Sequence, residues 1–396
     1  MIRYFLNFNK GSLQQELDNY FAQATPDSIP TQTVTKFAFS TARKNLLPSS
    51  FINLNHEVIE IYYRKNTAIK TWHGHRLCGI DGSQIRIPDE PEIVDEYGVN
   101  PGKDNQKDCP LALVSTYYDV LNHICIDSSI NPTKTSEKAC AALHLQKALP
   151  NDLSLLDRGY NAFWIYALYR AKEQFFCMRA SVGSNLLAQA FVESGKKEEV
   201  VTFKAGKNAI KRCEDEGFSS QPMRLRLVRV ELENEVEVLI TNLLDEKDYP
   251  VTEFKGLYHL RWGIEENFKR LKQWVEIENF SGKSVLSVKQ DFYAKILSTN
   301  LAFMLINASQ QQVDKTKRKT KYPYQINYAQ ALSKMKNSII RLLDLVKNRN
   351  ALEKRIKALI KYIAQTTEAI RVGRSFKRPD FKIKNRKFYS AYKRAM

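Results

Sequence analysis

The order of strand-like and helix-like segments between residues 75 and 179 limits this chain to a small set of folds. Short apolar or alternating runs predict strands at 75–87, at two segments within 111–127, at 153–156 and at 175–179. Helices are predicted between the later strands, at about 139–149 and 163–174. Three strands, a helix, a strand, a helix and a strand make a mixed α/β sheet with flanking helices. The predicted fold class is therefore α/β.

A second pattern interrupts this sheet at residues 178–251. Two segments, 223–232 and 236–243, alternate with period two, which predicts a β-rich insertion. The main domain is then expected to resume with a helix near 258–272 and an apolar helix at about 285–306. We therefore predict a main α/β domain made of residues 71–177 and 252–310.

Both ends of the chain are predicted to be helical. Ser12 is placed to cap a helix that runs to about residue 23, and a second helix is expected at 33–45. Residues 1–70 then form an N-terminal helical module, and a DNA-binding helix-turn-helix and an ordinary small bundle both fit its pattern. The C-terminal region, 311–396, is predicted to contain one amphipathic helix at about 339–363.

The positive charge of the chain is concentrated in its C-terminal region. Residues 311–396 hold 24 Lys and Arg against 5 Asp and Glu, whereas residues 1–310 hold 37 against 38. The whole excess behind the formal net charge of +18 therefore lies in the C-terminal region. So many like charges repel one another unless a polyanion neutralises them. Nucleic acid is the predicted partner.

The rest of the composition excludes several classes of protein. The six cysteines include no Cys-x-x-Cys pair and have no His at ligand spacing, so reduced thiols are predicted rather than disulfides or zinc ligands. No leader-like segment opens the chain, and no apolar run approaches 18 residues. We therefore expect an intracellular, cytoplasmic protein that does not cross a membrane.

Residues 258–272 place four polar side chains on one side of a predicted helix. At 100° per residue, an arc of about 60° contains Tyr258, Arg261, Glu265 and Lys272. Apolar residues occupy the neighbouring arc, so this polar stripe borders a buried face. A carboxylate flanked by an aromatic hydroxyl and two cations suits a metal ion and a phosphodiester. Trp262 is expected to pack in the core.

Three carboxylates stand where a metal site built on a sheet requires them. Asp81 lies in the first strand, Asp157 ends a later strand, and Glu265 is on the striped helix. Each alone is typical of a turn or cap residue, but the order strand, strand, helix matches a two-magnesium phosphoryl-transfer site. Magnesium prefers carboxylates, waters and phosphate oxygens. Two such ions activate the attacking oxygen and stabilise the leaving oxygen of a phosphodiester.

These motifs resemble those of the DDE transposases of bacterial insertion sequences. The aspartates lie in Gly-Ile-Asp-Gly-Ser and Leu-Leu-Asp-Arg-Gly-Tyr, and the helix carries Tyr-x2-Arg-x3-Glu-x6-Lys at 258–272. That spacing is similar to the Tyr-Arg-Glu-Lys signature of one branch of the family. The resemblance covers about residues 70–310. It implies a ribonuclease-H-like catalytic core made of 71–177 and 252–310, interrupted by the insertion at 178–251.

The resemblance also implies a role for each residue. Asp81, Asp157 and Glu265 would be the catalytic carboxylates and hold two Mg²⁺ ions, with Mn²⁺ as a substitute. DNA next to a base flipped out near the end of the element would be bound by Tyr258, Arg261 and Lys272. The implied reaction is cut-and-paste: cleavage at the ends of an insertion sequence, then strand transfer into target DNA. The implied partners are double-stranded DNA and a second copy of the chain, in a homodimeric complex at the bacterial nucleoid.

Two other functions and one structural question stay open from the sequence. A DNA nuclease with the same core would share the three carboxylates, and a domesticated DNA-binding regulator would be expected to have lost at least one. In well-known relatives, a Trp of the insertion stacks on the flipped base, but this chain has no Trp between Trp164 and Trp262. Any aromatic face can stack on a base, which leaves four candidates: Phe191, Phe203, Phe218 and Tyr249.

Overall fold

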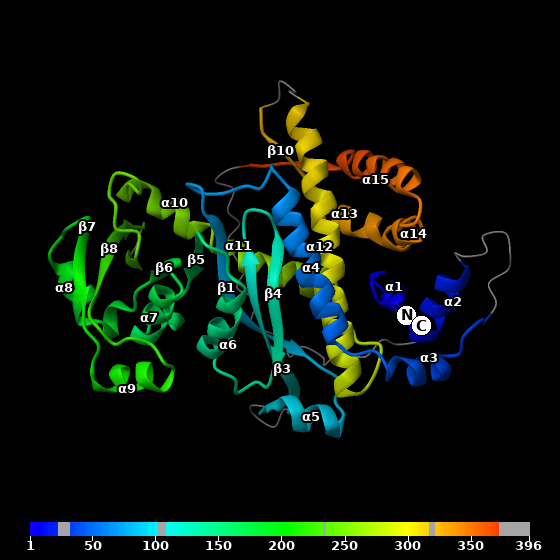
Figure 1. Ribbon diagram of the computed structural model, residues 1–396, viewed down its shortest axis with the longest axis horizontal. Helices are drawn as coiled ribbons and strands as arrows, with labels where there is room; N and C mark the ends of the chain where they lie inside the picture. Colours follow the sequence, from blue (N-terminus) through cyan, green and yellow to red (C-terminus); the bar gives the residue numbers. More distant parts are fainter. Residues whose placement is uncertain (23–31, 102–107, 233–234, 317–320, 372–396) are drawn as a thin grey trace. The chain divides into compact units, whose positions relative to one another are not determined.

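The computed structural model describes residues 1–22, 32–101, 108–232, 235–316 and 321–371 (Figure 1). The chain divides into two compact units, each assembled from segments that are distant in the sequence. Unit 1 comprises Met1–Lys65, Gln84–Ala112 and Lys269–Met396, and unit 2 comprises Asn66–Ser83 and Leu113–Phe268. The boundaries predicted at residues 70, 177, 251 and 310 stay predictions.

Unit 2 is built around a mixed sheet whose strands run in the order β3-β1-β5-β6-β9-β8-β7, with β4 paired to β3. Their bounds are β1 (Arg76–Arg86), β3 (Cys109–Asp119), β4 (Ile124–Asn131), β5 (Asp152–Leu156), β6 (Phe175–Arg179), β7 (Glu198–Phe203), β8 (Met223–Glu231) and β9 (Val236–Thr241). β1, β5 and β6 are parallel, and β4 is antiparallel to β3. The five strands predicted between residues 75 and 179 are all present.

Two helices connect the parallel part of this sheet, α6 (Glu137–His144) before β5 and α7 (Phe163–Ala171) between β5 and β6. Helical crossovers are what parallel neighbouring strands require. Residues such as Ile165 and Leu168 on α7 are buried in the core with Phe176 of β6. Three leading strands followed by helix, strand, helix and strand form the ribonuclease-H-like α/β fold that the sequence predicts, so this prediction is confirmed.

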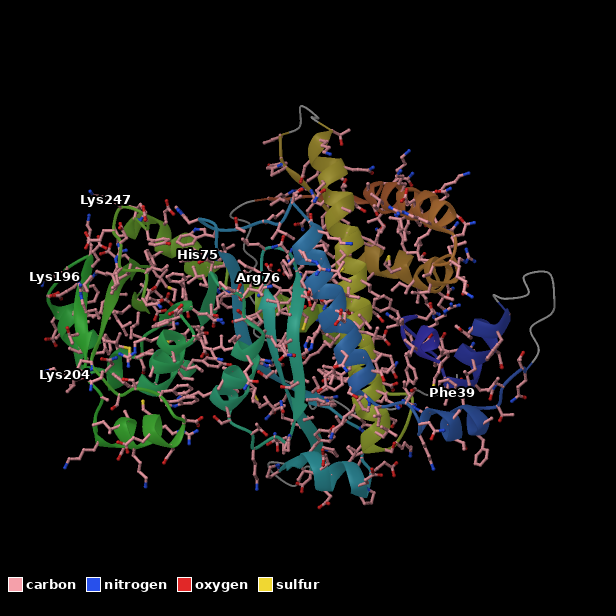
Figure 2. All side chains as sticks on the ribbon, viewed as in Figure 1. Phe39, His75, Arg76, Lys196, Lys204 and Lys247 are labelled. Carbon is pink, nitrogen blue, oxygen red and sulfur yellow. The ribbon has the colours of Figure 1, made fainter. Side chains whose placement is uncertain are left out.

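The insertion extends the sheet. β9 lies antiparallel to β6, β8 to β9 and β7 to β8, and Figure 1 shows β7 and β8 at one end of the sheet. The strand pair predicted at 223–243 is confirmed, whereas β7 and the helices α8 (Leu186–Glu193) and α9 (Lys207–Asp215) are additions that the β-rich prediction does not contain. Exposed lysines project from this end, among them Lys196, Lys204 and Lys247 (Figure 2).

A buried ion pair fixes the start of the two central strands. The guanidinium of Arg76 on β1 donates two hydrogen bonds to Asp152 on β5, at 2.8 and 2.6 Å, and Tyr117 donates a third at 2.7 Å. Figure 2 shows Arg76 and its neighbour His75 at this end of β1. Bidentate pairing satisfies both charges where neither is solvated. The contact therefore sets the parallel register of β1 and β5.

The segment predicted as one helix at 258–272 is divided in the structure. After a short turn at Val251–Glu253, α10 (Phe254–His259) ends and α11 (Trp262–Gln273) begins a few residues further on. The N–H groups of Leu260, Arg261, Gly263 and Ile264 bond to carbonyls three residues back. Such bonds tighten the turn to about 3.0 residues. The arc calculated at 100° per residue is therefore wrong across this junction.

Unit 1 is mostly helical. Its elements are α1 (Ile2–Phe5), α2 (Leu13–Ala22), α3 (Lys36–Arg43), α4 (Ser49–Lys65), α5 (Pro91–Tyr97), α12 (Val285–Lys315), α13 (Tyr328–Met335), α14 (Ser338–Asp344) and α15 (Arg349–Ala364), with short strands β2 (Val99–Asn100), β10 (Tyr324–Ile326) and β11 (Thr367–Ala369). The helix predicted at 285–306 is confirmed and is longer. It packs against α4 and α15. Buried Arg43 of α3 pairs with Asp291 of α12 at 3.3 Å.

The single amphipathic helix predicted at 339–363 is wrong, because the structure has α14 and α15 separated by a loop. The side chain of Asn348 accepts a hydrogen bond from the backbone N–H of Ala351 at 3.1 Å. An Asn in this position caps the start of a new helix.

Two further observations concern the cysteines and the apolar content of the helices. All six cysteines are free, and all except Cys109 are buried. Within the part of the chain that the structure describes, we find no helix with the length and apolar content needed to cross a membrane.

Candidate active site

Asp81 lies on β1, and Asp157 immediately follows β5, the neighbouring parallel strand. The register pairs Gly79 of β1 with Leu155 of β5. Two residues further along each strand bring Asp81 opposite Asp157, and a step of two keeps a side chain on the same face. Paired strands are about 4.8 Å apart. Parallel pairing thus brings these carboxylates together, although 76 positions separate them in the sequence.

The two carboxylates occupy a poorly solvated place. Burial raises the pKa of Asp81 to about 7, and the negative charge of Asp157 contributes to that rise. Asp81 accepts a hydrogen bond from the N–H of Gly82 at 2.9 Å, which acts in the opposite direction. Asp157 accepts one from the N–H of Gly159 at 2.7 Å. Each aspartate is therefore oriented by its own backbone, and a cation between them would stabilise their charged forms.

Two glycines let α11 approach the strand that bears Asp81. A Cβ atom on Gly79 would lie 3.3 Å from Cβ of Ile264, and one on Gly263 would lie 3.2 Å from Cβ of Val120. Both distances are tighter than ordinary side-chain contacts. Ile264 is fully buried at this junction. The close packing brings Glu265, the next residue of α11, toward the sheet.

Arg261 holds Glu265 and lies near Asp81. Its Nη2 donates to Oε1 of Glu265 at 2.8 Å, and its side chain is 13% exposed. The positive charge of Arg261 opposes the rise in the pKa of Asp81. The guanidinium also lies 5.7 Å from the ring centroid of Tyr258. Arg261 is thus placed between the helix carboxylate and the sheet.

Tyr258 connects α10 to the end of β5. Its ring is buried, and its hydroxyl donates to the carbonyl of Leu156 at 3.2 Å. Leu156 immediately precedes Asp157, so this bond supports the backbone from which Asp157 projects. In the structure, the hydroxyl of Tyr258 is engaged by the protein itself. Its predicted contact with DNA stays a prediction.

Lys272 lies two turns beyond Glu265 on α11, in the part of the helix that belongs to unit 1. Its Nζ donates to the carbonyl of Gln84 at 2.7 Å. Burial lowers the pKa of Lys272. The protein itself therefore engages this ammonium, and its predicted contact with DNA stays a prediction.

Comparison with known proteins identifies the family. The family model described as "Transposase DDE domain" matches residues 72–301, more than half of the chain. The chain belongs to this family. The match covers Asp81, Asp157 and Glu265, but it does not distinguish the Tyr-Arg-Glu-Lys branch.

Two relatives with similar sequences are named as transposases. The transposase InsG for insertion sequence element IS4, from Escherichia coli (strain K12), is 23% identical over 232 residues, covering 58% of this chain and 52% of InsG. "Putative transposase InsZ" from the same strain is 32% identical over 88 residues, covering 22% of this chain and 29% of InsZ. The chain therefore spans about half the length of InsG and less of InsZ. A solved piggyBac transposase synaptic complex with hairpin DNA is similar at 8% identity and a TM-score of 0.40, over 90% of this chain and 74% of that one.

The DDE carboxylates agree with a magnesium site in chemistry but not yet in spacing. All three supply oxygen ligands, which magnesium prefers, and it often uses only one or two protein carboxylates with waters and phosphate oxygens. Among the described residues, however, no group of three His, Cys, Asp or Glu side chains is gathered closely enough to hold a metal ion. Asp81 and Asp157 fit such an ion as a pair. Glu265 is instead bonded to Arg261.

The four aromatic residues considered for base stacking are occupied within the protein. Phe191 and Phe203 are buried, and Phe218 packs against the core of unit 2. The ring of Tyr249 is stacked on Trp72 at 5.7 Å, and its hydroxyl bonds to Nε2 of His75 at 2.8 Å. Two of the four, Phe191 and Phe203, are therefore buried, whereas Phe218 and Tyr249 are partly exposed and have partners within the protein.

The prediction that Trp262 packs in the core is wrong. It is 43% exposed, and the guanidinium of Arg261 lies 5.7 Å from its ring centroid. The tightened turn between α10 and α11 changes the direction of this residue from that calculated for one continuous helix. Trp262 is therefore an exposed aromatic surface beside Arg261.

A Ser-His-Asp arrangement elsewhere in unit 2 is structural. Nδ1 of His144 lies 2.7 Å from Asp127, and its Nε2 lies 3.0 Å from the hydroxyl of Ser115. These are hydrogen-bond distances of the kind found in hydrolase triads. Ser115 has 0% exposure and His144 has 1%, so no substrate reaches the hydroxyl. The network instead joins β3, β4 and α6.

The sequence does not single out Glu137 and Tyr160, which also adjoin the aspartates. Glu137 opens α6, and its negative charge contributes to the raised pKa of Asp81. Tyr160 follows Asp157 in a short turn, Arg158–Tyr160. The register of β1 and β5 identifies the aspartates, but the nearness of Glu137 depends on how α6 packs on the sheet. A periodic pattern in the sequence does not contain that information.

Proposed function

We propose that this chain is a Mg²⁺-dependent DNA transposase of an insertion sequence. It cleaves DNA at the ends of the element and joins those ends to target DNA. The observation that carries the proposal is the parallel register that pairs Gly79 with Leu155, two residues before Asp81 and Asp157, in a chain of the DDE family. The parallel sheet fixes these carboxylates rigidly, as phosphoryl transfer requires.

The residues of the site have separate roles in this proposal. Asp81 and Asp157 would hold the metal ions, and Glu265, which Arg261 binds in the structure, would be the third carboxylate ligand. The metal ions supply an activated attacking oxygen and stabilisation of the leaving oxygen. Arg261 then binds a phosphate of the DNA, to which a guanidinium donates two parallel hydrogen bonds. Tyr258 keeps the end of β5 in position through the carbonyl of Leu156.

The arrangement around Arg261 supports membership of the Tyr-Arg-Glu-Lys branch. Tyr258, Arg261 and Glu265 lie within one local cluster, and Lys272 follows on the same helix as Glu265. In this assignment, Lys272 binds the DNA backbone as a point charge. Trp262 replaces the four aromatic residues of the insertion as the side chain that stacks on a flipped base. The protein acts as a homodimer on two DNA ends, in the bacterial cytoplasm.

A cleavage and joining assay tests the proposal. The full-length protein is incubated with Mg²⁺, a target plasmid and linear DNA that carries the inverted repeats flanking its gene. We expect cuts at the repeat ends and covalent joining to the plasmid, both abolished when EDTA removes the metal. Cutting without joining would favour the nuclease. Specific binding of the repeats without any cutting would favour the regulator.

A further inference from the structure

Glu137 lies against the strand that bears Asp81. A Cβ atom added to Gly82 would come within 2.6 Å of Oε1 and 2.8 Å of Cδ of Glu137. Real Cβ atoms essentially never come so close, so a side chain at position 82 would require the Glu137 carboxylate to move. The carboxylate of Glu137 therefore rests on the backbone immediately after Asp81, although it comes from α6 and is distant in the sequence.

Glu137 is exposed along most of its length, but its carboxylate is electrostatically coupled to the site. Burial raises its pKa, and the negative charge of Asp157 adds to that effect. The positive charge of Arg261 acts on Asp81. The same guanidinium also donates a hydrogen bond to a fourth carboxylate, that of Glu265. Neighbouring carboxylates of like charge destabilise one another unless a cation compensates them.

Tyr160 provides a second, independent observation beside the aspartates. Its side chain is 1% exposed, and its hydroxyl has no hydrogen-bond partner within the described ranges of the chain. The charges of Asp81, Glu137 and Asp157 all act on this hydroxyl. Buried polar groups nearly always have a partner, which is often an ordered water. The unpartnered hydroxyl thus marks a place for water among the three carboxylates.

We propose that Glu137 and Tyr160 bind the water shell of a divalent cation held by Asp81 and Asp157. Glu137 accepts a hydrogen bond from a metal-bound water, and the hydroxyl of Tyr160 bonds to a water of the same shell. Magnesium retains several waters when it binds proteins, and outer-sphere partners orient its ligands. Both residues are therefore positioning residues. This inference rests on the proposed function, because it assumes that the two aspartates bind the cation.

The test is a titration of the full-length protein with Mn²⁺, in which electron paramagnetic resonance measures the free ion. Glu137→Gln removes the charge and keeps the shape, Tyr160→Phe removes only the hydroxyl, and Gly82→Ala displaces the Glu137 carboxylate. Outer-sphere changes weaken metal binding by about 10- to 100-fold. We expect about tenfold weaker Mn²⁺ binding for Glu137→Gln and Gly82→Ala, and a smaller decrease for Tyr160→Phe. The double variant Gly82→Ala/Glu137→Gln should bind no more weakly than either single variant, because both act on the same carboxylate.

Two controls separate this inference from the proposed function. Glu214→Gln changes an exposed glutamate at the end of α9 and should bind Mn²⁺ like the wild type. Thermal unfolding without metal should be unchanged in Glu137→Gln, which excludes a purely structural effect. Wild-type Mn²⁺ affinity in Glu137→Gln and Tyr160→Phe, with weakened binding in Asp81→Ala, would overturn the inference alone. A wild-type protein that neither binds Mn²⁺ nor cuts DNA would overturn the proposed function.

Discussion

The acidic centre of unit 2 and the basic C-terminal region of unit 1 hold their charged groups in different ways. Asp81 and Asp157 project from adjacent strands and accept backbone hydrogen bonds. By contrast, lysines on α15 such as Lys354, Lys357 and Lys361 are exposed along one helix and line a shallow depression. Chemistry on a phosphodiester needs fixed ligands, whereas binding a polyanion depends mainly on charge density. Single substitutions should therefore matter greatly in the acidic centre and little in the basic region.

The largest expected effect is the disappearance of DNA cleavage when a DDE carboxylate is removed. Asp81→Ala, Asp157→Ala and Glu265→Ala should each lower the Mg²⁺-dependent cleavage rate by at least about 10³-fold, since residues that act as one unit fail together. Binding of end-bearing DNA, measured by gel shift, should stay within about twofold of the wild type. Substantial cleavage by any of the three, with Mg²⁺ as the only metal, would contradict the assignment.

A smaller effect is expected from removing the end of the basic region. Deleting residues 371–396 removes ten Lys and Arg and one Asp; residues 372–396 lie outside the described part of the chain. The plot of log K against log salt should become shallower by about 0.9 for each DNA phosphate that this segment neutralises in the full-length protein. Fluorescence anisotropy at several salt concentrations measures this slope. An unchanged slope would mean that the tail aids solubility without binding DNA.

Substitutions of Arg261 and Lys272 test whether these residues act in DNA binding or in the cleavage reaction itself. If a base is flipped before the second strand is cut, Arg261→Ala and Lys272→Ala should accumulate singly nicked DNA on an end-bearing substrate. Denaturing gels resolve the nicked product, and Glu265→Ala should leave the substrate uncut. The ion pair between Arg261 and Glu265 makes the opposite outcome informative. If Arg261→Ala also leaves the DNA uncut, its main role is to position Glu265.

The smallest expected effect concerns Trp262. Stacking of an aromatic side chain on a base contributes about 1–3 kcal/mol. Trp262→Ala should thus slow second-strand cleavage about tenfold, whereas Trp262→Phe should retain most of the rate. A fluorescent base analogue at the end of the DNA reports flipping directly. Equal fluorescence in wild type and Trp262→Ala would exclude this residue as the stacking partner.

Local patterns in the sequence are sufficient to predict some parts of the molecule. Strand alternation and the aspartate motifs predict the central sheet, and its parallel order then brings Asp81 and Asp157 together. The break before Trp262 is not predicted, because i to i−3 hydrogen bonds leave no mark in the spacing of apolar residues. The split between α14 and α15 could have been predicted from the sequence, because Asn348 is a residue type that commonly caps the start of a helix. Glu137 escapes prediction because its place depends on the packing of α6.

The pairing of β9 with β6 has a consequence for how this protein can change over time. After β6 the chain adds β7 and β8 to the end of the sheet, and it comes back beside β6 at β9. The insertion therefore begins and ends at one edge, so residues can be added or removed within it without shifting the strands that bear the aspartates. Selection on the length of this segment is consequently separate from selection on the catalytic geometry. The surface of this segment can therefore vary while the spacing of Asp81 and Asp157 in the sheet stays the same.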